Sequence, residues 1–170
     1  SNYFEKFEKY DFDLWQKSLS GNLSSIFIVT KSVVNHMLKR KRGSIINIAS
    51  DVGVISPDHR IYKPNKKTNY KGVKFNTPLS YSVSKAGIIS MTRYLATYWA
   101  KSGIRVNCIS PAGVYKKHDK KFVEQLSARI PLGRMAKKHE FNGAIIYLCS
   151  NASSFVTGHN LVIDGGRTIW

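Results

Sequence analysis

Hydrophobic residues recur every three or four positions in the first quarter of the chain. From Trp15 to Leu38 they fall on one face of a helix, so the pattern predicts one long amphipathic helix. Asp13 is its predicted amino-terminal cap and Gly43 its predicted stop. The four cations at positions 39–42 then lie at the negative end of the helix dipole, where they stabilise the helix end.

Short apolar runs predict three β-strands, at Ser44–Ala49, Ile104–Ser110 and Leu161–Ile163. The first run is nearly unbroken, which is typical of a parallel strand covered on both faces. We therefore expect Ser44–Ala49 to be an interior strand of a sheet.

Helical patterns separate these strands. One is predicted over Tyr81–Lys101, with Ser80 as its cap and Gly103 as its stop, and shorter ones over Phe122–Arg129 and Glu140–Cys149. Strands separated by helices of this length pair in parallel through right-handed crossovers. The pattern therefore predicts an α/β protein, with functional sites at the carboxyl ends of its parallel strands.

The stretch 51–79 interrupts this alternation. It has no periodicity and holds three prolines, so we expect a long, mobile loop. Its cations could meet an anionic group of a substrate, although a solvated loop is the simpler interpretation. They are Arg60, Lys63, Lys66, Lys67, Lys71 and Lys74.

Length and composition fit one globular domain over residues 1–170, with 42% hydrophobic residues. Cys108 and Cys149 lie in apolar segments without the spacing of a zinc site, so we expect two buried thiols, no disulfide and no metal. The segment Ser1–Tyr10 is charged and aromatic, and no run reaches roughly 18 apolar residues. We therefore expect a cytoplasmic protein that does not cross a membrane.

The formal net charge of +17 raises the alternative of a polyanion or nucleic-acid binder. Most lysines, however, are scattered in pairs, and no signature of a nucleic-acid-binding module accompanies them. Nucleic acid is therefore an unlikely partner.

Tyr81 and Lys85 provide candidate chemistry, because a four-residue interval places both side chains on one face of the predicted helix. Lowering the pKa of a phenol from about 10 by about three units requires roughly 4 kcal/mol. One cation about 4 Å away at an effective dielectric constant of about 20 supplies roughly that amount. Alone, this pair is common on exposed helices, but Ser50 and Ser110–Gly113 also follow predicted strands.

Seven segments, which together span nearly the whole chain, resemble the short-chain dehydrogenase/reductase family in order and chemistry. They are residues 15–23, 43–50, 81–87, 103–111, 131–135, 157–158 and 164–166. Residues 57–62, inside the basic loop, are similar to family members linked to bacterial surface-sugar and flagellin modification. This resemblance implies an NAD- or NADP-dependent oxidoreductase acting on a carbonyl or secondary alcohol, with a sugar or sugar derivative as the expected substrate.

The resemblance also assigns roles to four catalytic residues. Tyr81 is the expected general acid/base, and Lys85 lowers its pKa and holds the nicotinamide ribose. Ser50 orients the reacting carbonyl or hydroxyl, and Asn22 holds a water that relays the proton.

The resemblance places the nicotinamide carboxamide against the loop Pro111, Ala112, Gly113 and Val114. Ala112 replaces the family's usual second glycine, and Lys116 replaces a threonine that commonly contacts the cofactor. The stretch 51–79 becomes an insertion beside the substrate pocket, and the turn 164–166 has a structural role near subunit contacts.

The family's first strand and Gly-rich turn, which cradle the cofactor pyrophosphate, do not occur among the 170 residues. The expected fold is therefore an incomplete Rossmann-type, doubly wound parallel sheet, and the choice between NAD and NADP stays open. A homo-oligomer, dimeric or tetrameric, is the expected assembly. The alternative is a truncated, catalytically inert fragment that binds a subunit.

Overall fold

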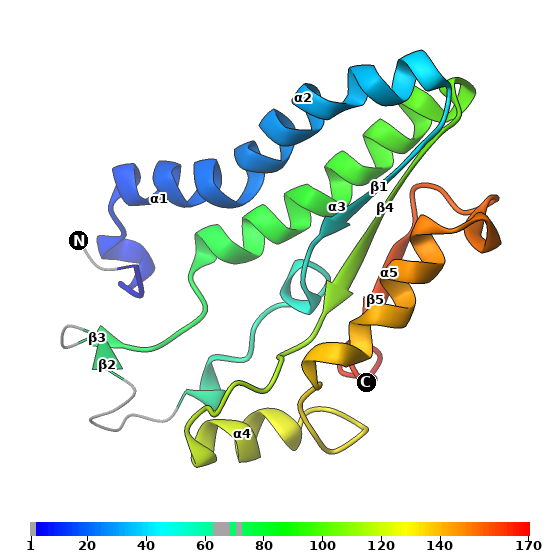
Figure 1. The fold of residues 1–170 in the computed structure, drawn as a ribbon. Helices are drawn as coiled ribbons and strands as arrows, with labels where there is room; N and C mark the ends of the chain where they lie inside the picture. Colours follow the sequence, from blue (N-terminus) through cyan, green and yellow to red (C-terminus); the bar gives the residue numbers. More distant parts are fainter. Residues whose placement is uncertain (1–2, 63–68, 71–72) are drawn as a thin grey trace.

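A three-stranded parallel sheet forms the centre of the molecule. The structure, a computed structural model, describes residues 3–62, 69–70 and 73–170. In spatial order the strands are β1 (Gly43–Ile48), β4 (Ile104–Pro111) and β5 (Asn160–Ile163). The helices α2 and α3 lie on one side of the sheet and α5 lies on the other (Figure 1). This arrangement confirms the predicted α/β class and its doubly wound parallel sheet.

The register of β1 and β4 sets the position of the site. Gly43 pairs with Ile104 at one end and Ile48 with Ile109 at the other. Residues that follow the two strands therefore leave the sheet side by side. In the described part of the chain β1 has β4 as its one neighbour, so the expectation of an interior strand was wrong for this sheet.

The first helical region is divided in two. Helix α1 spans Phe12–Leu19, a π-helical turn covers Ser20–Ser24, and α2 spans Ser25–Arg40. The carboxylate of Asp11 accepts a hydrogen bond from the backbone N–H of Leu14, so the predicted cap at Asp13 was wrong by two residues. Both positions carry aspartate, and periodicity alone does not separate them.

The two long helices end in different ways. Lys41 adopts a left-handed conformation with φ 49° and ends α2, whereas Gly43 opens β1, so Gly43 is not the stop. After α3, a 3-10 turn at Ala100–Ser102 leads to Gly103, which has φ 73°. A Cβ there would collide with the carbonyl oxygen of Lys41, which explains why glycine ends this helix as predicted.

Helix α3 spans Leu79–Trp99, and Pro78 occupies its cap position. The predicted cap Ser80 lies inside the first turn, fully buried, and its hydroxyl is 3.0 Å from the hydroxyl of Tyr10. That cap prediction was therefore wrong, because Ser80 bonds the amino-terminal segment instead. None of the helices in the described part of the chain combines the length and hydrophobicity that a membrane crossing needs.

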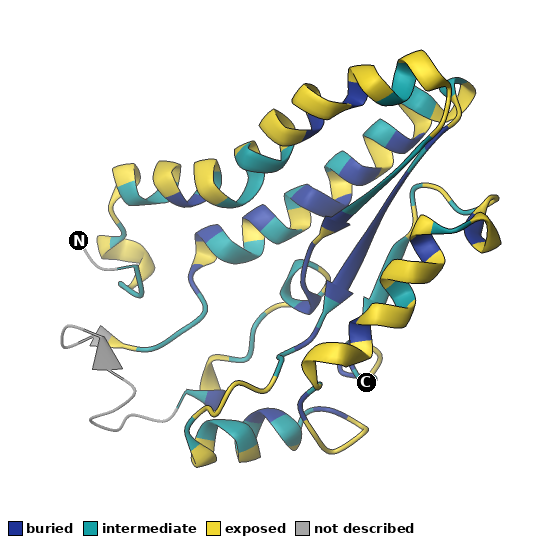
Figure 2. Ribbon diagram, viewed as in Figure 1, coloured by how far each residue is buried: buried dark blue, intermediate teal, exposed yellow. Residues whose placement is uncertain are grey.

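The core lies between α3 and the sheet. Ile88, Val106 and Cys108 have no exposed surface, and the burial pattern along α3 and β4 is visible in Figure 2. The buried thiol at Cys108 confirms one of the two cysteine predictions. Cys149 is exposed at the end of α5, so the other was wrong. Both thiols are free.

Each end of the last two helices lies within two residues of its predicted position. Helix α4 spans Lys120–Ser127 and α5 spans Asn142–Cys149, after a 3-10 turn at Lys138–Phe141. Asp119 caps α4 by accepting hydrogen bonds from two backbone N–H groups. Strand β5 starts one residue before its predicted range.

The stretch 51–79, predicted as a long, mobile loop without periodicity, contains short elements of local structure. It holds 3-10 turns at Asp51–Gly53 and His59–Ile61, and an antiparallel pair of β2 (Asn69–Tyr70) and β3 (Val73–Lys74). The physical reason is burial: Ile61 packs into a hydrophobic cluster beside α4.

Candidate functional site

Most of the predicted site residues line one cavity of about 400 Å³ at the carboxyl ends of β1 and β4. Ser50 follows β1, and Tyr81 and Lys85 project from the first turns of α3. Pro111 to Val114 line the same cavity from the end of β4. Segments far apart in the sequence therefore converge here, as the topology of a parallel sheet requires.

Ser50 is buried in extended backbone directly after β1. Its hydroxyl donates a hydrogen bond to Oδ1 of Asp51 over 2.9 Å. The same oxygen of Asp51 accepts a bond from the backbone N–H of Val52 over 2.8 Å. The serine side chain is thus held in one direction by the residue that follows it.

Tyr81 lies partly buried, and its phenol reaches the hydroxyl of Ser50. Burial raises the pKa of the phenol, the hydrogen bond with Ser50 opposes that rise, and the carboxylate of Asp51 adds to it. The net pKa lies above the ordinary value of 10.0, so the phenol keeps its proton at neutral pH.

Lys85 is half-buried beside Tyr81. Its Nζ donates a hydrogen bond to the carbonyl oxygen of Ile48 over 2.9 Å and lies 5.5 Å from the centre of the Tyr81 ring. Burial lowers the pKa of this ammonium. The net pKa of Tyr81 is raised because burial dominates at the phenol, and the ammonium of Lys85 bonds the strand end. The expected role of Lys85 in lowering the pKa of Tyr81 stays a prediction.

Asn22 lies in the π-helical turn between α1 and α2. Its side-chain nitrogen donates to the carbonyl oxygen of Ser18 over 2.9 Å, and it is not among the residues that line the cavity. Leu23, the next residue, packs against Gly87 of α3. The structure therefore brings Ser50, Tyr81 and Lys85 together at the cavity, whereas Asn22 does not line it.

The loop after β4 is fixed by backbone hydrogen bonds. The N–H of Ala112 donates to the carbonyl of Ile163, and the carbonyl of Gly113 accepts from Ala136 over 3.1 Å. Val114 forms an isolated parallel bridge with Ala136. These contacts hold the loop as a wall of the cavity.

Two further residues of the cavity were missed by sequence reasoning. Asp51 and Arg167 line it, and both side chains are almost fully buried. They form an ion pair behind Ser50. A carboxylate directly after a strand end was a usable signal for Asp51, whereas no local pattern connects it to a partner 116 positions away.

The stretch 51–79 forms one side of the cavity through Ile61, Tyr62 and Thr77. The ring of Tyr62 stacks on Phe122 of α4 at 5.6 Å, and its hydroxyl is 3.0 Å from that of Thr77. Burial raises the pKa of Tyr62. Ile61 and Tyr62 are therefore packed against α4 at the cavity.

The cations of this stretch have different surroundings. Arg60 pairs with Asp58, which also accepts a hydrogen bond from Arg129 over 2.6 Å. Hydrogen bonds from Arg60 and Arg129 hold the pKa of Asp58 well below its usual range. Lys74 lines a neighbouring cavity, whereas four other cations lie outside the described residues: Lys63, Lys66, Lys67 and Lys71.

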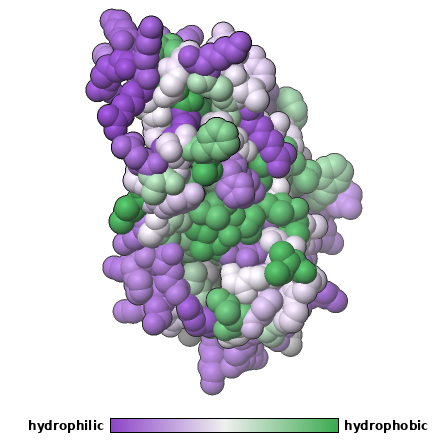
Figure 3. Space-filling view, turned by 90° about the vertical axis from the view of Figure 1, so that its right-hand side faces the viewer, coloured by the Kyte–Doolittle hydropathy of each residue, from purple (hydrophilic) through white to green (hydrophobic). Residues whose placement is uncertain are grey.

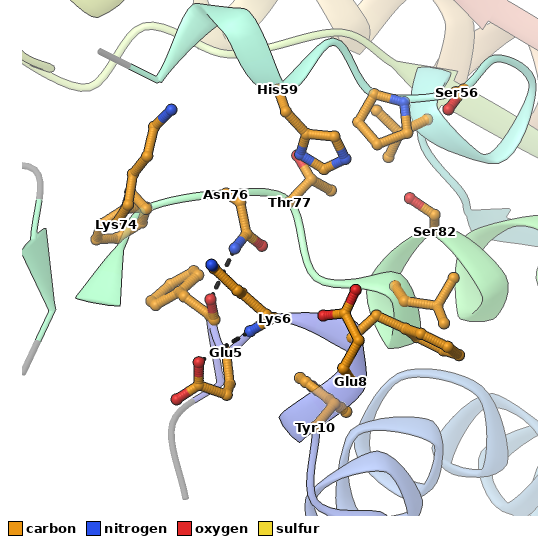
Figure 4. A pocket seen from close by; sticks show the side chains of 16 residues that line it. Glu5, Lys6, Glu8, Tyr10, Ser56, His59, Lys74, Asn76, Thr77 and Ser82 are labelled. Carbon is orange, nitrogen blue, oxygen red and sulfur yellow. Dashed lines mark hydrogen bonds between the residues drawn. The ribbon is translucent and has the colours of Figure 1, made fainter. Parts of the chain in front are cut away.

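That neighbouring cavity, of about 1190 Å³, lies between the amino-terminal segment and the loop around His59. In Figure 4 the side chains of Lys6, Asn76 and Ser82 surround it from three different segments. Val52 and Thr77 line both cavities, so the two adjoin. Most of its lining surface is hydrophobic.

The turn at 164–166 follows β5. Asp164 accepts hydrogen bonds from the backbone N–H groups of Gly166 and Thr168, over 2.8 and 2.7 Å. Burial raises the pKa of Asp164, but these hydrogen bonds lower it, and the net pKa lies below its ordinary value. Gly165 and Gly166 have positive φ, which a turn of this kind allows to glycine. The turn presents Arg167 to the cavity.

Two protein-family patterns cover almost the whole chain. The short chain dehydrogenase pattern matches residues 2–66, and that of enoyl-(acyl carrier protein) reductase matches residues 68–168. A relative, 2-dehydro-3-deoxy-D-gluconate 5-dehydrogenase of Bacillus subtilis, is 36% identical over 95% of this chain and 59% of its own length.

Solved structures show the same likeness. A short chain dehydrogenase from Leptospira borgpetersenii with bound NAD+ is 36% identical, with a TM-score of 0.86 over 98% of this chain and 61% of the other. A gluconate 5-dehydrogenase from Burkholderia cenocepacia, in complex with NADP and tartrate, is 29% identical, with a TM-score of 0.80 over 96% and 60%. The chain thus spans about three fifths of the length of these relatives.

Proposed function

The chain belongs to the short-chain dehydrogenase/reductase family, and we propose that it forms the catalytic part of an NAD(P)-dependent oxidoreductase. The reaction transfers a hydride between nicotinamide and a carbonyl or secondary alcohol. The observation that carries this proposal is the convergence of Ser50, Tyr81 and Lys85 on one cavity at the strand ends.

Tyr81 acts as the proton donor when a carbonyl is reduced. The phenol carries its proton at neutral pH and so has the proton that a general acid donates. In the reverse direction the phenol must first lose its proton, so alcohol oxidation gains from higher pH. Ser50 lies beside the phenol and orients the reacting oxygen against it.

The cavity fits the nicotinamide end of the cofactor. Its volume of about 400 Å³ lies in the range of small-molecule sites, roughly 300–1,000 Å³. Lys85 has three N–H donors and uses one on Ile48, which leaves two for ribose hydroxyls. The loop Pro111 to Val114 offers backbone groups to the carboxamide. When bound, nicotinamide supplies or accepts the hydride.

Asn22 keeps its proposed role in proton relay, although it does not touch the cavity. It lies in a π-helical turn, a local distortion frequent at functional sites. Its carboxamide fixes the turn by bonding the carbonyl of Ser18. A water held there would connect the site with bulk solvent through Lys85.

A sugar, sugar acid or related polyol is the proposed substrate class. The Bacillus subtilis relative is named for a sugar acid, and the Burkholderia cenocepacia structure contains tartrate, a small hydroxy acid. The larger cavity of Figure 4 adjoins the reacting one and would take the part of the substrate distant from the reacting carbon. Aromatic Phe4 and Phe75 and polar Asn76 line it.

The assembly we propose is a homo-oligomer. On the side of the molecule that carries α5, hydrophobic surface gathers between hydrophilic regions (Figure 3). On α5 the side chains of Ile145, Ile146 and Tyr147 are exposed, and on α2 those of Phe27 and Ile28. Such surfaces are typical of contacts with another polypeptide.

Both cysteines are free thiols, which fits the proposed cytoplasmic location.

The central test is Tyr81→Phe in the protein that contains this chain. Turnover of 2-dehydro-3-deoxy-D-gluconate or D-gluconate with NAD(H) or NADP(H) should fall by at least roughly 100-fold, because general acid–base catalysis contributes about that much or more. Tyr98→Phe, at an exposed position of the same helix, is the matched control and should keep full activity. Equal turnover of the two variants would exclude the assignment.

Calorimetric titration of the chain with NADH and NADPH adds a second test. A catalytic role requires cofactor binding, and the preferred cofactor identifies the NAD or NADP specificity. An inert subunit-binding fragment predicts no binding of either.

A further inference from the structure

A buried ion pair lies directly behind the hydroxyl of Ser50. The side chains of Asp51 and Arg167 are 5% and 7% exposed, and Nη1 of Arg167 donates to Oδ2 of Asp51. The other oxygen of Asp51, Oδ1, accepts the hydrogen bond of the Ser50 hydroxyl. One carboxylate therefore connects the reacting cavity to the turn after β5.

This arrangement fixes the direction of the serine hydroxyl. A hydroxyl has one proton, and Ser50 donates that proton to Asp51. The oxygen of Ser50 accepts a hydrogen bond from the backbone N–H of Val52 over 3.4 Å, which holds it beside the phenol of Tyr81. A carboxylate accepts only, so Asp51 cannot reverse the direction of this bond.

Arg167 in turn holds the side chain of Asp51 in place. A buried carboxylate without a partner is unfavourable, and the guanidinium removes that penalty. Arg167 is presented by the turn in which Asp164 bonds two backbone N–H groups. The ion pair thus joins two parts of the chain that are far apart in the sequence.

We propose that Asp51, held by Arg167, is a positioning residue that fixes the Ser50 hydroxyl against Tyr81 and so connects the carboxyl-terminal turn to the reacting site. The inference rests on the proposed function, in which Ser50 and Tyr81 are the reacting groups. Neither Asp51 nor Arg167 is assigned a proton-transfer step.

The same geometry makes the tyrosine a reporter of the pair. The Asp51 carboxylate disfavours the phenolate of Tyr81. Further titratable groups face Tyr81 or line its cavity from other segments and stay unchanged in the test. They are Tyr3, Tyr62, Lys85, Lys116 and His118.

The test is a titration of tyrosine rings labelled with carbon-13, followed by NMR in the ligand-free protein, with Tyr81→Phe assigning the signal. In Asp51→Asn the midpoint of Tyr81 should fall by about one pH unit, a tenfold change in its ionisation constant. Glu140→Gln, which removes a carboxylate paired with Arg134 at the surface, is the control and should leave it unmoved. An unchanged midpoint in Asp51→Asn would overturn the inference.

A double variant, Asp51→Asn with Arg167→Gln, removes both charges and leaves no lone buried ion. It keeps the test available if the single variant does not fold, and its Tyr81 midpoint should also fall. In active protein, Asp51→Asn should lower kcat at least tenfold with little change in KM, because a positioning residue does not bind substrate. Retained turnover in Tyr81→Phe would refute the proposed function alone, whereas an unmoved midpoint would refute this inference alone.

Discussion

Gly53 lies where the turn after Ser50 presses against α3. A Cβ at this position would sit 2.7 Å from the carbonyl carbon of Lys85 and 2.9 Å from the backbone nitrogen of Ala86. Ordinary contacts begin at 3.4 Å, so Gly53→Ala requires a movement of about 0.7 Å, the difference between 3.4 and 2.7 Å. Helix α3 is held by the buried side chain of Ile88, so the turn moves instead.

The cost follows from two opposing effects. Overpacking destabilises the folded state by about 1–3 kcal/mol. Replacing glycine with alanine also restricts the backbone of the unfolded chain, which stabilises the protein by about 0.4–1 kcal/mol. We therefore expect Gly53→Ala to lower the free energy of unfolding by about 1–2 kcal/mol, or the melting temperature by roughly 2–8 °C. Because Ser50 and Asp51 move with the turn, turnover should fall roughly tenfold to 100-fold.

Urea unfolding followed by circular dichroism measures the stability, and a nicotinamide absorbance assay measures turnover. Gly143→Ala is the matched control, because a Cβ at Gly143 of α5 meets nothing within 4 Å. It should stabilise the protein by roughly 0.5–1 kcal/mol and leave turnover unchanged. If both variants unfold at the same urea concentration, the close approach at Gly53 does not exist as described.

Two further predictions concern buried and exposed polar pairs. Thr92→Val removes the acceptor of the Asn47 amide in the core, a bond of 2.9 Å, and should cost about 1–3 kcal/mol in urea unfolding, against less than roughly 0.5 kcal/mol for exposed Thr97→Val. Arg134 lowers the pKa of Glu140 from 4.5 to about 2, so the stability from this pair is present above pH 4.5 and lost as pH falls toward 2. Glu140→Gln should flatten that part of an acid unfolding profile, and an unchanged profile would contradict the pairing.

Elements were predictable from the sequence where the signal was local. The left-handed glycine at Gly103 and the apolar run of β4 are such cases, because each depends on a few adjacent residues. Caps were less certain: Asp11 and Asp13 are both plausible, and Pro78 rather than Ser80 precedes α3. Tertiary contacts, such as the hydrogen bond between Ser80 and Tyr10, determine which residue occupies the cap position.

The site was predictable as a set of residues and less so in its electrostatics. The spacing of Tyr81 and Lys85 correctly placed both at one cavity, because helical geometry is fixed. The direction of the Tyr81 pKa depends on burial and on Asp51, which a sequence does not display. The partner of Asp51 comes from beyond β5, so only the folded chain brings Arg167 to it.

The placement of Arg167 makes the segment after β5 a poor location for an inserted epitope tag. Three residues further along, the indole of Trp170 donates a hydrogen bond to the backbone carbonyl of Arg129 over 3.3 Å. An insertion between Arg167 and Trp170 would therefore pull on the guanidinium that secures Asp51. The cost of such an insertion would appear as lost turnover at the other end of the ion pair.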